Sequence, residues 1–145
     1  KSQVVLSGLI KDIDLLSKEL ESKKIKNIKL NVSSPFHCKY MKSASNKMTS
    51  SINNLKITKL NKPIISNVTA KEAYSPEQIK TLLISQIEKK VRWLESVEYM
   101  INNGIKNFVE IGPGKVLSGL IKRINKDVNV KSINNEEDIK LLLND

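Results

Sequence analysis

The apolar positions of this chain follow two spacings, which predict an alternation of strands and helices. A β-branched run at Gln3–Ser7 and an alternating apolar–polar run at Ile28–Val32 are each typical of a strand. Between them, apolar residues recur every three or four positions and predict a helix with one apolar stripe, formed by Leu9, Ile13, Leu16 and Leu20. Such a strand–helix–strand unit favours a right-handed crossover, but two strands alone make a marginal sheet.

The alternation continues to the C-terminus. The predicted helices are Met41–Asn54, a helix capped by Ser75 with Pro76 at its first position, a helix that ends at Asn102–Gly104, Val116–Ile124 and Glu136–Leu143. The predicted strands are Pro63–Val68, which we expect to be buried, Phe108–Ile111 and Val128–Ile133. Strands that alternate with helices indicate an α/β fold with a parallel sheet.

Composition excludes several classes of protein. The chain has 145 residues, a single-domain size, and contains no apolar run near the 18 residues that a membrane span requires. Nothing in it resembles a secretory signal. Its single cysteine cannot form an internal disulfide or a cysteine-rich metal site, so we expect no metal and a reducing, cytoplasmic location.

The formal net charge is +10, and nearly all the cations are lysines. A solvated lysine-rich surface is the first explanation, and a face for an acidic protein or phosphorylated ligand is the second. Nucleic acid ranks third, because base readout and stacking favour arginine and aromatic residues, and aromatics make up only 4% of the chain.

The only histidine and the only cysteine lie together in Asn31–Met41, between a predicted strand and a predicted helix. Pro35 fixes its own φ and keeps the residue before it extended, so it starts a turn that presents His37. Imidazole titrates near neutral pH and suits acid–base catalysis. A surface histidine without a catalytic role is the alternative that chemistry alone leaves open.

Two further features have alternative explanations. Gln86 lies on the apolar stripe of the helix after Ser75, where its amide either satisfies a nearby backbone group or serves a site. The turn Gly112–Lys115 joins a strand to a helix and either offers backbone N–H groups to an anion or packs tightly. It is not a Walker A loop, because the spacer and the hydroxyl residue after lysine are missing.

Five motifs, in order, give the chain a resemblance to a known family. They are Gln3–Gly8, Val32–His37 (VSSPFH), Pro63–Thr69 (PIISNVT), Gln86 followed by Val91–Trp93, and Glu110–Leu117 (EIGPGKVL). Together they resemble the C-terminal half of the malonyl-CoA:acyl carrier protein transacylases, over nearly the whole chain.

The resemblance implies a fold and a division of the chain. The family has an α/β-hydrolase-like core with an inserted ferredoxin-like subdomain. On this mapping, residues 1–33 are the second part of the small subdomain, and residues 34–145 are the C-terminal part of the α/β core.

The resemblance also implies a reaction in fatty-acid synthesis. A serine on a nucleophile elbow takes malonyl from malonyl-CoA and passes it to the phosphopantetheine thiol of acyl carrier protein, without a cofactor. His37 matches the catalytic base, and Gln86 matches the position whose backbone carbonyl orients the imidazole. Phe36 and Asn67 match family motifs on the substrate side. We also expect a monomer when the protein is complete and, from the composition, no membrane or nucleic-acid partner.

The chain departs from the family in one respect. The elbow serine, the arginine that pairs with the malonyl carboxylate and the oxyanion segment are absent, and no Gly-x-Ser-x-Gly replaces them. We therefore expect the fragment alone to be inactive and its serine to lie outside these residues. An acyltransferase domain of a polyketide-type synthase and a non-catalytic remnant that binds a carrier protein are the alternative readings.

Overall fold

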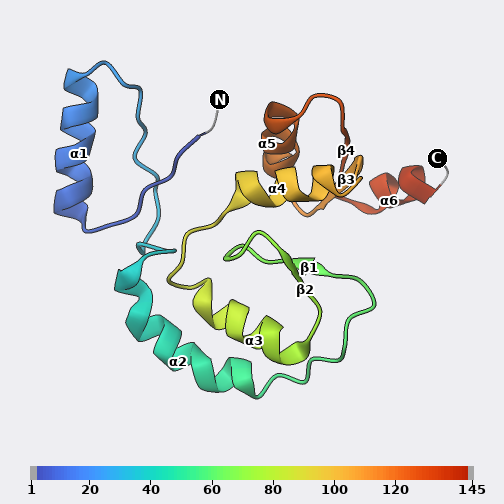
Figure 1. Ribbon diagram of the computed structural model, residues 1–145. Helices are drawn as coiled ribbons and strands as arrows, with labels where there is room; N and C mark the ends of the chain where they lie inside the picture. The colour runs from blue at the N-terminus through green and yellow to red at the C-terminus, as the bar shows by residue number, and fades with distance from the viewer. Residues whose placement is uncertain (1–2, 144–145) are drawn as a thin grey trace. The chain divides into compact units, whose positions relative to one another are not determined.

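The computed structural model describes residues 3–143 and confirms the α/β class (Figure 1). The elements fall into two compact units, Val4–Arg92 and the residues from Trp93 onward. The first contains α1 (Ile10–Ser22), a 3₁₀ turn η1 (Lys39–Met41), α2 (Lys42–Asn53), β1 (Ile64–Ile65), β2 (Glu72–Ala73) and α3 (Pro76–Ser85). The second contains α4 (Trp93–Asn102), β3 (Asn107–Ile111), α5 (Val116–Ile124), β4 (Asn129–Ile133) and α6 (Glu136–Leu143).

Helix α1 forms as predicted, but the two strands predicted beside it do not. Residues 3–7 and 28–32 adopt no strand structure, and the side chains of Val4 and Ile28 are each 74% exposed. A β-strand is stable only when a neighbour accepts and donates its backbone hydrogen bonds, and these segments have none. Polar contacts hold α1 to the segment after it, including an ion pair of 2.6 Å between Lys29 Nζ and Asp14 Oδ1.

Helices α2 and α3 pack side by side in the first unit (Figure 1). Their apolar faces bury Ile52 and Ile79. The predicted start of α3 is confirmed, because the backbone N–H of Gln78 donates to Ser75 Oγ at 3.1 Å and Pro76 occupies the first turn. The cap therefore fixes where α3 begins, and the apolar stripe fixes which side of α3 is buried.

The strand predicted as a buried run at Pro63–Val68 is much shorter in the structure. Only Ile64–Ile65 pairs, in antiparallel register with Glu72–Ala73, and Ile64 is 48% exposed. The chain turns back at once, since the N–H of Ala70 donates to Ser66 O at 2.8 Å. This turn takes Ala70 to a φ of +55°, a conformation for which no sequence signal exists.

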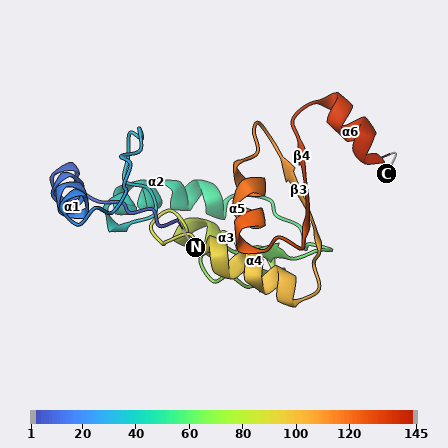
Figure 2. The same cartoon turned by 90° about the horizontal axis from the view of Figure 1, so that it is seen from above.

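The second unit is built on a two-stranded parallel sheet. β3 pairs with β4 from Asn107↔Asn129 to Ile111↔Ile133, and Figure 2 shows both strands beside α5. Val97, Ile121 and Val128 form its core, and Val97 is fully buried. Helix α4 ends where the sequence predicts, with Gly104 close behind it at a φ of +88°. The helices that the structure describes include none long and apolar enough to cross a membrane.

Candidate functional site: an imidazole anchored to the end of helix α3

His37 lies on a tight turn just before η1. The turn begins with a hydrogen bond of 2.9 Å from the N–H of Phe36 to Ser34 O, which closes the chain around Pro35. His37 itself has a φ of +62°, in the left-handed region that a non-glycine residue adopts at a cost of about 1–3 kcal/mol. Such conformations persist only where surrounding contacts hold them, and they concentrate at functional sites.

Two hydrogen bonds hold His37 in this conformation, and the acceptors of both lie in the chain just after α3. The backbone N–H of His37 donates to Ile87 O at 3.2 Å. The ring Nδ1–H donates to the backbone oxygen of Gln86 at 2.9 Å. Because a carbonyl can only accept, the proton of the neutral ring lies on Nδ1, and Nε2 keeps its lone pair. The ring is exposed, so this lone pair is accessible.

Gln86 is the C-cap of α3 and not a residue within its stripe. Its side-chain Oε1 accepts from Asn67 Nδ2 at 3.3 Å, so this oxygen bonds to another side chain and not to a nearby backbone group. Asn67 is anchored in turn, because its backbone oxygen accepts from the N–H of Arg92 at 2.9 Å. The structure thus brings together His37, Gln86 and Asn67.

Other residues near His37 make no hydrogen bond to the imidazole that the structure describes. Phe36 is 49% exposed beside His37. The Cys38 thiol donates to Pro35 O at 2.9 Å, which directs it back into the turn. An exposed ion pair of 3.5 Å between Lys42 and Glu88 joins the start of α2 to the segment after α3, a contact of the kind that contributes at most about 1 kcal/mol.

The glycine turn after β3 is filled by the protein's own acceptors. The Glu110 carboxylate accepts from the N–H groups of Leu117 at 3.0 Å and Ser118 at 2.8 Å, at the start of α5. The Gly114 N–H donates to Asn134 Oδ1 at 2.6 Å. These bonds occupy the donors that an anion would use, so the structure favours tight packing over ligand binding at this turn.

Hydrogen bonds from Ser118 stabilise the charged form of Glu110. The Ser118 hydroxyl donates to its carboxylate at 2.6 Å. That bond, followed by the Ser118 N–H, lowers the pKa of Glu110 below its ordinary value. The carboxylate is thus held charged at the N-terminus of α5, where the helix dipole also favours it.

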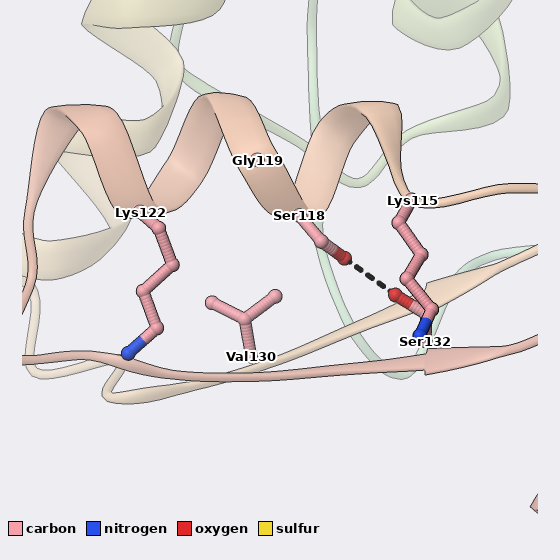
Figure 3. A pocket seen from close by; sticks show the side chains of 6 residues that line it. All are labelled: Lys115, Ser118, Gly119, Lys122, Val130 and Ser132. Atoms are coloured by element: carbon pink, nitrogen blue, oxygen red, sulfur yellow. Dashed lines mark hydrogen bonds between the residues drawn. The ribbon is translucent and has the colours of Figure 1, made fainter.

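A groove of about 340 Å³ lies between α5 and β4 (Figure 3). Ser118 Oγ and Ser132 Oγ are hydrogen-bonded at 2.7 Å along it, and Lys122 Nζ donates to Val128 O at 2.6 Å. Its lining contains no histidine or cysteine that could act as a base or nucleophile. The groove therefore has no counterpart to the imidazole of the His37 turn.

Residues 3–143 include no cluster of three or more His, Cys, Asp or Glu side chains that could hold a metal ion. The chemistry available at the His37 turn is that of an oriented, accessible imidazole with a free Nε2. An imidazole held by a neutral acceptor, with its second nitrogen unprotonated, can act chemically as a general base.

Comparison with known proteins identifies the class further. The chain is 40% identical, over 141 residues, to the malonyl CoA-acyl carrier protein transacylase of Staphylococcus aureus. This match covers 95% of the present chain and 45% of the Staphylococcus aureus protein. It superposes on the acyl-carrier-protein S-malonyltransferase of Bartonella henselae with a TM-score of 0.86 and 36% identity, over 92% of this chain and 43% of the other. A third match is a malonyl-transacylase solved with its type II polyketide acyl carrier protein, with a TM-score of 0.87 and 31% identity over 95% of this chain and 45% of the other. No family model matches the chain.

The chain thus has the fold of acyltransferases. It is a homologue of the malonyl CoA-acyl carrier protein transacylases, which confirms the resemblance in its motifs. It spans about half the length of the relatives it matches, and that half is the C-terminal one.

Proposed function

We propose that this chain supplies the general base of a malonyl transacylase that loads acyl carrier protein for fatty-acid synthesis. The observation that carries the proposal is the hydrogen bond of 2.9 Å from His37 Nδ1–H to Gln86 O, which leaves Nε2 as the basic atom. In this proposal the nucleophilic serine and the carboxylate-binding arginine come from outside these 145 residues. Residues 1–33 belong to the small subdomain, and residues 34–145 to the core.

The proton transfers follow from this arrangement. Nε2 of His37 takes the serine proton as the oxygen attacks the malonyl thioester, and the imidazolium then gives that proton to the leaving coenzyme A sulfur. In the second half-reaction, Nε2 takes the proton of the pantetheine thiol as its sulfur attacks the malonyl ester, and the imidazolium returns that proton to the serine oxygen as the acyl–oxygen bond breaks. During each step the Gln86 carbonyl keeps its bond to Nδ1–H, so the ring orientation does not change.

The proposal also covers the substrate side of the site and the acyl acceptor. In this proposal Phe36, half exposed beside the imidazole, faces the malonyl group, and Asn67 lies on the substrate side as well. The charge of +10 suits an acidic carrier protein. A polyketide carrier protein is the second candidate acceptor, favoured by the related malonyl-transacylase solved with such a carrier. We place the reaction in the cytoplasm, where the free thiol of Cys38 stays reduced.

A chimera tests the proposal. The N-terminal half of the Staphylococcus aureus transacylase would be joined to this chain, and malonyl transfer from labelled malonyl-CoA to acyl carrier protein measured. We expect a malonyl–serine ester by mass spectrometry, followed by transfer to the carrier. A chimera that unfolds cooperatively, and so is folded, yet forms no ester would refute the proposal.

The 145-residue chain alone serves as the control. We expect it to form no malonyl adduct, because covalent catalysis needs a nucleophile within about 3 Å of its base. An adduct on Cys38 would show that the chain carries its own nucleophile and would overturn the assignment of an external serine.

A further inference from the structure

We infer that Asn67 is a positioning residue for the imidazole of His37, acting through the side chain of Gln86. The inference rests on the proposed function, because it assigns Asn67 a part in orienting the proposed base. It also differs from the substrate contact predicted for Asn67 from the sequence.

The first step of the argument concerns the Gln86 carbonyl. Gln86 follows the last residue of α3, with a φ of −66° and a ψ of −16°. The last carbonyls of a helix have no partner within it and are less constrained than those of its interior. The N–H of Gln86 donates to Leu82 O at 2.9 Å, and the N–H of Ile87, in the same peptide unit as the Gln86 carbonyl, donates to Ile84 O at a longer 3.3 Å. These backbone bonds set the general direction of the oxygen that receives the Nδ1 proton, and a contact of the Gln86 side chain can restrain it further.

The second step concerns what supplies that restraint. The side chain of Gln86 is partly buried, and its Oε1 accepts from Asn67 Nδ2 at 3.3 Å. Asn67 lies on the turn between β1 and β2, where the buried Ser66 accepts from the Val68 N–H at 3.1 Å. The backbone oxygen of Asn67 accepts from the Arg92 N–H at 2.9 Å. Gln86 is thus tied to a turn that is itself tied at two points.

The third step sets the size of the effect. A donor–acceptor distance of 3.3 Å is slightly long for an N–H···O bond, so the restraint is a modest one. We expect loss of the Asn67 amide to lower the ratio of the Nδ1–H to the Nε2–H tautomer of His37 by about two- to fivefold, within the range of one net hydrogen bond.

The experiment uses the single histidine of the chain. The 145-residue protein, labelled with ¹⁵N-histidine, gives one pair of ring nitrogen signals, whose chemical shifts report the tautomer at a pH where the ring is neutral. Asn67→Ala should lower the Nδ1–H share, and Asn61→Ala, an exposed asparagine of the same unit, should leave it unchanged. Gln86→Met should act like Asn67→Ala, whereas Gln86→Glu, which keeps an oxygen for Asn67 Nδ2, should retain the wild-type ratio.

The outcomes separate the two roles of Asn67. An unchanged ratio in Asn67→Ala and Gln86→Met would overturn the inference and leave the substrate contact as the remaining role. Equal changes in Asn67→Ala and Asn61→Ala would also overturn it, since they would show general loosening. If Asn67→Ala does not fold, the two Gln86 variants decide alone. The readout needs no substrate, so failure of malonyl transfer in the chimera would not alter it.

Discussion

Replacing His37 with alanine separates the chemical part of the imidazole from its structural part. In the chimera, we expect malonyl transfer to fall by about 10²–10⁴-fold, the usual share of general acid–base catalysis. The structural loss is one hydrogen bond of 2.9 Å from an exposed ring, worth about 0.5–1.5 kcal/mol net. The left-handed backbone remains held by the bond from the residue 37 N–H to Ile87 O.

These magnitudes decide how the result is read. A 100-fold loss of rate corresponds to about 2.7 kcal/mol of transition-state stabilisation. A destabilisation near 1 kcal/mol leaves a domain of ordinary stability almost wholly folded, so it cannot imitate that loss. The assay is single-turnover transfer from labelled malonyl-CoA, with urea unfolding of both proteins as the control. Near-normal transfer by the alanine variant would refute the assignment of His37 as the base.

Three further predictions concern Gln86, Glu110 and the lysine-rich surface. Gln86→Ala should reduce transfer less than His37→Ala in the same assay, because the acceptor for Nδ1–H is a backbone oxygen; equal losses would reveal a direct role for the side chain. The lowered pKa of Glu110 means that its bonds to α5 stabilise the fold above its ordinary pKa, and that this stability is lost as pH falls through the folded value. Glu110→Gln should therefore unfold at lower temperature at pH 7, and the difference from wild type should shrink toward pH 3 by calorimetry; a constant difference would contradict this. Transfer to acyl carrier protein should weaken as salt rises while transfer to pantetheine does not, and parallel salt curves would favour a merely solvated lysine surface.

Local signals in the sequence predicted the helices well. Ser75 caps α3, Gly104 follows the end of α4, and the apolar runs after residue 107 pair as parallel strands. Each of these features depends on residues close together in the chain or on a short apolar run. The turn that presents His37 belongs to the same group, because Pro35 acts on its immediate neighbours.

Features that depend on distant partners escaped prediction. The segments at 3–7 and 28–32 have strand-like sequences, yet a strand needs a neighbour that these residues do not supply. The bond between Asn67 and Gln86 joins residues 19 apart, and no periodicity marks it. For the glycine turn, the sequence left anion binding and tight packing as alternatives. The structure favours tight packing, because the Glu110 carboxylate, positioned by the pairing of β3, accepts from the N–H groups at the start of α5.

The anchoring of His37 to the end of α3 has a consequence for assembly. The backbone bond and the ring bond of His37 both lie within a single compact unit, so the ring is oriented before any nucleophile approaches. Rotational freedom that is lost during folding does not have to be lost again at the moment of reaction. A nucleophile carried on a separate polypeptide would then need only to dock in one pose.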